Sequence, residues 1–156
     1  MPKNDVVIDA NIFISALIGS QTNLKIIKSS TYRMYAPSKL IEELQRNKAM
    51  VCEKAGCTPY DFDNNLDALL KLVKIVEYEQ YKNHLLKATE VLGPQHTADA
   101  HYLACALIIK ASFIWTNDKN FSRQILIPAK STRQVLIRIK IFKYLNHVIS
   151  SKMRER

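Results

Sequence analysis

Two polar residues follow an apolar run near the start of the chain, where a buried strand would end. In the stretch VVIDANIFIS, residues 6–15, these residues are Asp9 and Asn11. A carboxylate at the end of a buried strand costs several kcal/mol unless it is paired or bound to a metal ion. This cost points to a chemical role for Asp9, with Asn11 as its polar support.

Three further acids are expected at the same edge of the molecule. Asp118 follows the apolar segment SFIW by two residues, and Asp99 lies in the first turn of the helix that precedes this segment. At about 100° per residue, Glu43 lies at the border of its helix's apolar face, whereas Glu42 points away from that face. Each acid also has a purely structural explanation, as a helix N-cap, a partner of the helix dipole or a surface residue.

Four acids at one edge would repel one another, and a divalent cation relieves that repulsion. Carboxylate oxygens select hard ions such as Mg²⁺ or Mn²⁺, which keep water molecules for chemistry. Such an ion lowers the pKa of a bound water and stabilises charge during phosphodiester hydrolysis. The predicted catalytic and metal-binding residues are therefore Asp9, Glu43, Asp99 and Asp118. The residues expected to hydrogen-bond the carboxylates or the scissile phosphate are Asn11, Thr116 and Asn117.

The composition fits a protein that binds a polyanion. The 156 residues include 23 Lys and Arg against 14 Asp and Glu, a net charge of +9, which favours a polyanionic partner such as nucleic acid. The three cysteines have neither paired spacing nor a nearby histidine pair for zinc, as expected for reduced thiols. The longest apolar run, residues 103–109, is far shorter than the roughly 20 residues that cross a bilayer. We therefore expect a cytoplasmic protein that is not bound to a membrane.

The elements that must position the acids alternate between strands and helices. Strands are expected in DVVID, YRMYAP, KIVEY and SFIW. Helices are expected over residues 10–19, 23–28, 38–56, 80–92 and 97–111. A further helix is expected to begin after Thr58, its N-cap. Continuous apolar strands are typical of a parallel sheet covered on both faces. The pattern predicts a three-layer α/β/α sandwich with a mostly parallel central sheet, in which ligands bind beyond the carboxyl ends of the strands.

The C-terminal part of the chain is basic. We expect one domain over residues 1–144 and a basic tail over residues 145–156, the end of an amphipathic segment that starts near Ser131. The cations of this segment either bind phosphates or form a solvated helix face. His96, three residues before Asp99, is expected to face solvent rather than RNA.

Four sequence blocks carry a family resemblance. VVIDANIFISAL, PSKLIEEL, TADAHYLACAL and FIWTNDKNF, in this order over residues 6–121, resemble the PIN-domain ribonucleases, including the VapC-type toxins of toxin–antitoxin pairs. The resemblance implies an α/β/α sandwich, a Mg²⁺ or Mn²⁺ site and endonucleolytic cleavage of RNA. It assigns the acidic positions of the family to Asp9, Glu43, Asp99 and Asp118, with Asn11 and Thr116 as polar companions.

The resemblance also implies partners. In the family, the helical pair that corresponds to residues 38–73 often forms dimer or antitoxin contacts, and here it contains the apolar residues Leu66, Leu69, Leu70 and Leu72. A homodimer with a possible cognate antitoxin is the expectation. The basic tail past about Tyr144 has no counterpart in the family pattern.

Two other functions remain open. A phosphoacceptor receiver domain also places acids at strand ends, but it expects a lysine directly at the end of a late strand, and ILIPAK offers Lys130 only after a proline. A catalytically silent RNA- or partner-binding module would keep the same fold without cleaving RNA. Phosphoryl transfer from a small phosphodonor tests the first alternative, and titration with Mn²⁺ tests the second.

Overall fold

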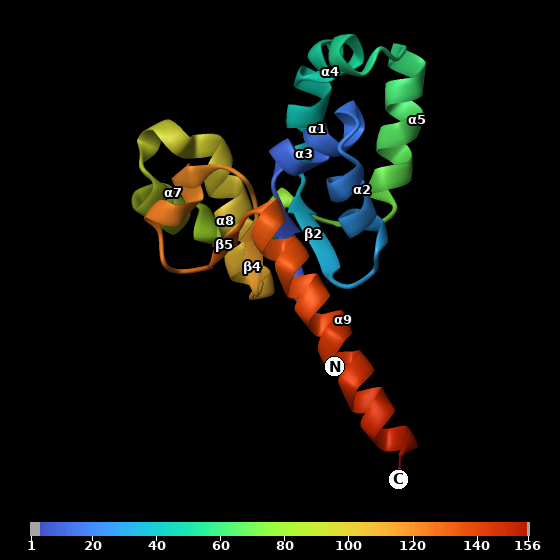
Figure 1. The fold of residues 1–156 in the computed structure, drawn as a ribbon. Helices are drawn as coiled ribbons and strands as arrows, with labels where there is room; N and C mark the ends of the chain where they lie inside the picture. Colours follow the sequence, from blue (N-terminus) through green and yellow to red (C-terminus); the bar gives the residue numbers. More distant parts are fainter. Residues whose placement is uncertain (1–3, 156) are drawn as a thin grey trace.

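A computed structural model describes residues 4–155 and shows a central parallel sheet with helices on both faces (Figure 1). The strands are β1 (Asp5–Ile8), β2 (Arg33–Pro37), β3 (Lys74–Val76), β4 (Phe113–Trp115) and β5 (Ala129–Lys130). They lie in the order β3-β2-β1-β4-β5, and every neighbouring pair is parallel. The predicted α/β/α sandwich is confirmed.

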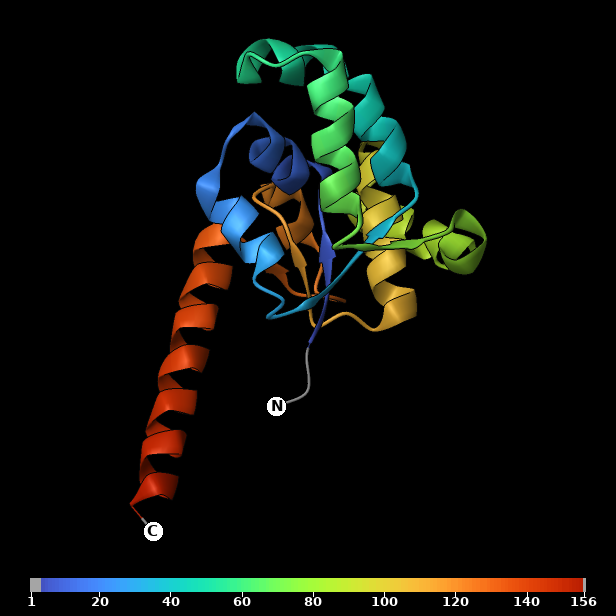
Figure 2. The same cartoon turned by 90° about the vertical axis from the view of Figure 1, so that its right-hand side faces the viewer.

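The helices form the two outer layers. Their bounds are α1 (Ala10–Ile18), α2 (Gln21–Lys28), α3 (Lys39–Arg46), α4 (Lys48–Ala55), α5 (Pro59–Leu70), α6 (Tyr78–Tyr81), α7 (Leu85–Leu92), α8 (Thr97–Ile109) and α9 (Thr132–Arg154). Short 3₁₀ turns are η1 (Lys82–His84), η2 (Pro94–His96) and η3 (Lys119–Arg123). Figure 2 shows α8 on one side of the sheet, with α1, α2 and the start of α9 on the other.

The sheet is buried on both faces, which explains its unbroken apolar strands. Val6, Val7 and Ile8 of β1 and Trp115 of β4 have no exposed surface. Side chains alternate between the two faces of a strand, so a strand covered on both sides needs apolar residues at every position. The first polar residue after β1 therefore marks the point where the chain leaves the core.

The helix predicted over residues 38–56 is two helices. Asn47 separates α3 from α4. Its Nδ2 donates to the Glu43 backbone oxygen over 2.7 Å. An asparagine that bonds nearby backbone competes with the regular helical ladder, which accounts for the break. Ser38, the predicted N-cap, has helical dihedral angles and makes no capping bond through its side chain. The predicted end at Gly56, in the left-handed conformation, is confirmed.

Two other predicted segments differ from the structure. The helix expected from about residue 80 to residue 92 is divided into α6, η1 and α7. The strand β5 was not predicted, because two residues after Pro128 are too few to show a strand pattern. The start of α5 agrees with the prediction: Thr58 accepts from the Asp61 N–H in a complete capping box, with Pro59 at the first helical position.

The C-terminal segment is one long helix. α9 runs from Thr132 to Arg154 and continues without interruption past residue 144, the predicted end of the domain. In both Figure 1 and Figure 2 its second half extends beyond the other elements, away from the edge of the sheet where the strands end. Residues 1–3 and 156, which belong to the predicted domain and tail, lie outside the described residues. Within residues 4–155, no helix has the length and apolar character that crossing a membrane requires.

Candidate active site

Asp9 occupies the centre of the candidate site. It follows β1 directly, caps the start of α1 and is only 3% exposed. Its backbone N–H donates to the Trp115 oxygen over 3.0 Å, which fixes it at the carboxyl ends of two adjacent strands. Burial raises the pKa of the Asp9 carboxyl group to about 6, and the negative charges of Asp99 and Asp118 add to this rise.

Thr116 connects two of the predicted site residues. Its hydroxyl group, just past the end of β4, donates to Asp9 Oδ2 over 2.8 Å. The Thr116 hydroxyl oxygen, Oγ1, in turn accepts from the backbone N–H of Asp118 over 2.9 Å. Asp118 also caps η3, since its Oδ1 accepts from the N–H of Asn120. Thr116 therefore orients the Asp9 carboxylate and holds the loop that carries Asp118.

Asp99 lies in the first turn of α8 and is partly buried. Burial raises the pKa of its carboxyl group, and the nearby charge of Asp118 raises it further. His96 Nδ1 lies 3.6 Å from Asp99 Oδ2, and the His96 side chain is only 16% exposed. The expectation that His96 faces solvent is wrong, because η2 folds its ring toward Asp99. In the sequence, the three-residue spacing between His96 and Asp99 is the signal that could have predicted this contact.

Glu43 approaches the site from α3. Burial raises the pKa of its carboxyl group to about 7, and the charge of Asp9 contributes to the rise. Within residues 4–155, Glu43 Oε1 and the Tyr102 hydroxyl of α8 are both buried and form no well-aligned hydrogen bond, although the two side chains are neighbours. By contrast, Glu42 is exposed and forms an ion pair with Lys39 over 2.9 Å. Tyr102 is not predictable as a site residue, because nothing in the sequence indicates which side of α8 faces Glu43.

Among the described residues, the two predicted asparagines make no side-chain hydrogen bond to the acids. Asn11 lies on α1 with an exposed side chain and makes no side-chain hydrogen bond among the described residues. Asn117 is bound to the start of α9: its Nδ2 donates to Thr132 Oγ1 over 3.2 Å, and its Oδ1 accepts from the Thr132 N–H over 2.9 Å. Of the three polar residues expected near the carboxylates, only Thr116 bonds one of them.

The acids suit a hard cation that keeps most of its water. Within residues 4–155, no group of three or more His, Cys, Asp and Glu side chains is arranged so that it could hold a metal ion directly. Mg²⁺, however, is commonly bound through one or two carboxylates and several waters. The all-oxygen donor set and the unpartnered Glu43 Oε1 fit that kind of binding. Burial, and to a lesser extent the charges of neighbouring acids, raises the pKa values of Asp9, Glu43 and Asp99, and a cation in the same place would relieve both costs.

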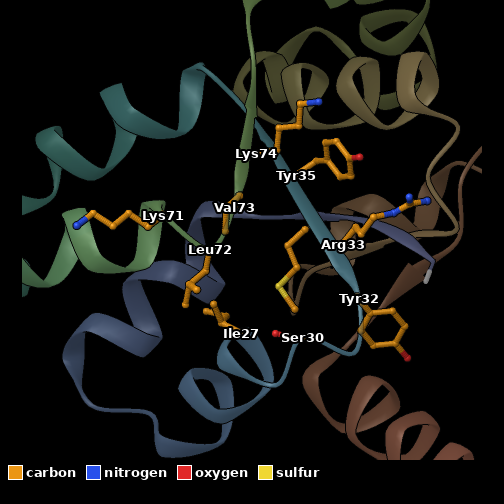
Figure 3. A pocket seen from close by; sticks show the side chains of 10 residues that line it. Ile27, Ser30, Tyr32, Arg33, Tyr35, Lys71, Leu72, Val73 and Lys74 are labelled. Carbon is orange, nitrogen blue, oxygen red and sulfur yellow. The ribbon is translucent and has the colours of Figure 1, made fainter. Parts of the chain in front are cut away.

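A separate hollow of about 540 Å³ lies at the opposite end of β2, where that strand begins (Figure 3). None of the four acids lines it. Arg33 at its rim already donates to Asp5 Oδ1 over 2.6 Å. Lys74 lies 6.0 Å from the centre of the Tyr35 ring, and Figure 3 shows Lys71 pointing away. The cations at this hollow are thus engaged or directed elsewhere, and the candidate site remains the acidic edge.

One buried acid and three partly buried ones at the carboxyl edge of a five-stranded parallel sheet, covered by helices on both faces, define an α/β protein with an acidic site. The family model described as "PIN domain" matches residues 7–140. The chain belongs to the PIN-domain family, as its sequence blocks indicated.

Solved structures share this fold. A chain of VapBC2 from Rickettsia felis, bound to a DNA fragment from its promoter, superposes with a TM-score of 0.62 at 17% identity and covers 81% of this chain and 98% of its own. A chain of DNA-bound VapBC from Salmonella typhimurium gives a TM-score of 0.65 at 17% identity, with 85% and 99% covered. No curated protein matches the sequence significantly.

Proposed function

We propose that this protein is a Mg²⁺- or Mn²⁺-dependent endoribonuclease that acts as the toxin of a toxin–antitoxin pair. The observation that carries the proposal is the burial of Asp9 within electrostatic reach of Asp99, Asp118 and Glu43. Fixing like charges together in a partly dry site costs folding free energy unless a cation compensates them. Membership of the PIN-domain family supports the same activity.

Asp9, Asp99, Asp118 and Glu43 are the residues that would hold the ion. When bound, the ion supplies an activated water and stabilises the charge that develops on the scissile phosphate. Thr116 keeps the Asp9 carboxylate oriented through its 2.8 Å hydrogen bond. Glu43 Oε1, with no partner and a carboxyl pKa of about 7, is suited to accept a proton near neutral pH. The exposed Asn11 side chain is proposed to contact the substrate, whereas the Asn117 side chain is bonded to Thr132.

The substrate and partners follow from charge and from the fold. A net charge of +9 favours a phosphate backbone, and RNA is the substrate proposed. The VapBC structures with the same fold support a cognate antitoxin, and a homodimer is part of the same proposal. Reduced cysteines and an RNA substrate agree with action in the cytoplasm. Leu66 and Leu69, however, are buried in the domain core, so they do not offer a dimer surface.

Cleavage of RNA by the metal-depleted protein, before and after addition of Mg²⁺ or Mn²⁺, tests this function. We expect cleavage only with the metal, and sequencing of the new RNA ends identifies the cut positions. Titration calorimetry with Mn²⁺ on the same protein separates the alternatives. Protein that binds RNA but neither binds Mn²⁺ nor cleaves would instead be the silent binding module.

A further inference from the structure

An apolar surface that the domain does not cover runs along α9, mostly on its second half. The side chains that form it are between 44% and 74% exposed, and Figures 1 and 2 show the second half of the helix free of other elements. We define the outer face of α9 by Ile137, Ile141, Tyr144, Leu145, Ile149 and Met153. At about 100° per residue, these six residues fall within half of the helix circumference.

The outer face is distinct from the side of α9 that packs on the domain. Val135 and Ile139 are buried against the domain. Around the helix axis, these two side chains point about 110° away from the centre of the outer face. At the base of the outer face, Gln134, Ile137 and Ile141 border a groove of about 260 Å³ with a mostly apolar lining. Helix packing within the domain therefore leaves this second apolar face open along the helix.

The positions of the cations leave the outer face free to pair with its own copy. Lys143 and Arg154 lie nearly opposite its centre, so two outer faces can meet without bringing these charges together. Arg138, within the arc, is turned toward the domain and lies 5.4 Å from the centre of the Phe113 ring. Lys152 lies near the centre of the outer face in the last turns of the helix, and its aliphatic stem can cover apolar surface while its amine stays in water.

This layout suits a second protein helix better than a lipid surface. A helix that lies on an anionic membrane places its cations where they reach the headgroups beside the apolar face. Lys143 and Arg154 would point away from such a surface. The six outer-face residues together expose roughly 700 Å² of accessible surface, close to the roughly 800 Å² that each partner buries in a standard protein interface.

We propose that the outer face of α9 pairs in antiparallel orientation with the outer face of a second copy of this chain. A two-fold axis midway between Asn146 and His147 sets Tyr144 of one copy against Ile149 of the other. The same axis sets Arg138 at the level of Glu155 of the second copy, whereas a parallel pair would align each cation with its equivalent. The inference gives the proposed homodimer its surface and does not depend on nuclease activity. It also places the two acidic edges at opposite ends of the helix pair.

Sedimentation analysis of the full chain with outer-face variants tests the pairing. We expect wild-type protein to be dimeric at tens of micromolar. The double substitution Leu145→Gln with Ile149→Gln should weaken the dimer by at least about 100-fold, because it removes two central apolar contacts from each copy. The matched control, His147→Gln with Ser150→Gln, changes the opposite side of the same helix turns and should leave the affinity within about twofold. Circular dichroism verifies that both variants keep the helix.

Three outcomes would overturn the proposal. They are a monomeric wild type at the highest concentration reached, an outer-face variant that dimerises like wild type, and a monomer whose outer face binds vesicles containing phosphatidylserine. RNA cleavage per active site, measured on the same samples, distinguishes the pairing through α9 from the proposed nuclease activity. A dimer lost only in the outer-face variant, in a protein that cleaves no RNA, would reject the nuclease and leave the pairing standing.

Discussion

At the scale of single residues, Asp9 is the position where charge and burial conflict most directly. Its side chain accepts a hydrogen bond from Thr116 and lies beside other acids. Asparagine can accept the same bond without the charge. We therefore predict that Asp9→Asn folds but lowers RNA cleavage by at least about 100-fold, as does Asp99→Asn, because each removes a carboxylate that would hold the ion. Initial cleavage rates with saturating Mn²⁺ measure the effect.

The pair Glu42 and Glu43 supplies the control for this prediction. Glu43→Gln removes the partly buried carboxylate with a raised pKa, whereas Glu42→Gln removes only an exposed partner of Lys39. Glu43→Gln should lose cleavage and Glu42→Gln should retain it. Equal activity in Asp9→Asn and wild type would be incompatible with the proposed site.

The raised pKa of Asp9 also predicts how stability depends on pH without metal. The folded protein holds this proton with a pKa of about 6, against a reference value of 3.8. Protonated Asp9 therefore stabilises the folded state fully below about pH 4. This contribution to the free energy of unfolding, about 3 kcal/mol, is lost as the pH rises through 6. Urea unfolding in EDTA between pH 4 and pH 7 should show this decline, with a shallower one for Asp9→Asn.

Added Mn²⁺ should reverse the trend for the wild type. A cation binds the ionised carboxylates, so its contribution to stability increases as they lose their protons. The gain at pH 7 should be larger for the wild type than for Asp9→Asn. If the free energy of unfolding in EDTA depended on pH as little in the wild type as in Asp9→Asn, Asp9 would not have a raised pKa.

At the scale of elements, the junction of β4 and α9 holds one side of the site. Thr132, the first residue of α9, accepts from Trp115 Nε1 over 3.1 Å and donates to Asn23 Oδ1 over 2.9 Å. It also bonds Asn117, one residue before Asp118. A single hydroxyl group thus joins α2, α9 and the loop that carries a site acid.

We predict that Thr132→Val lowers the free energy of unfolding by about 1–3 kcal/mol, because Trp115 and Asn23 lose their hydrogen-bond partner in a largely buried setting. Trp115 is the only tryptophan of the chain, so its fluorescence reports the change directly. Thr132→Ser keeps the hydroxyl group and should behave like wild type in unfolding and emission. An unaltered emission spectrum in Thr132→Val would show that the junction does not depend on this bond.

At the scale of the whole molecule, the acidic edge and the end of α9 lie apart. Because α9 extends away from the carboxyl edge of the sheet, its last residues are remote from RNA held at the acids (Figure 2). RNA affinity should fall with salt at a log–log slope of about −0.7 per phosphate contact. We predict that removal of residues 145–156 leaves this slope unchanged, measured with a short RNA and an inactive Asp9→Asn background. A flatter slope would assign RNA contacts to the tail.

Much of the arrangement follows from local sequence rules. The carboxyl ends of parallel strands share one edge, so residues that directly follow apolar strands, such as Asp9 and Thr116, could be assigned to that edge. Helical periodicity distinguished Glu43 from Glu42, and the capping box at Thr58 marked the start of α5. These features depend on residues close together in the chain.

Tertiary structure decided the features that depend on distant neighbours. The break at Asn47 and the two-residue strand β5 lack a repeating pattern, and β5 exists only because β4 supplies its partner. Leu66 and Leu69 look like an interface in sequence but are core residues, and the outer face of α9 is open only because the domain covers another side of that helix. Sequence determines which residues are apolar or charged and their local geometry, whereas burial and pKa depend on what the folded chain packs against them.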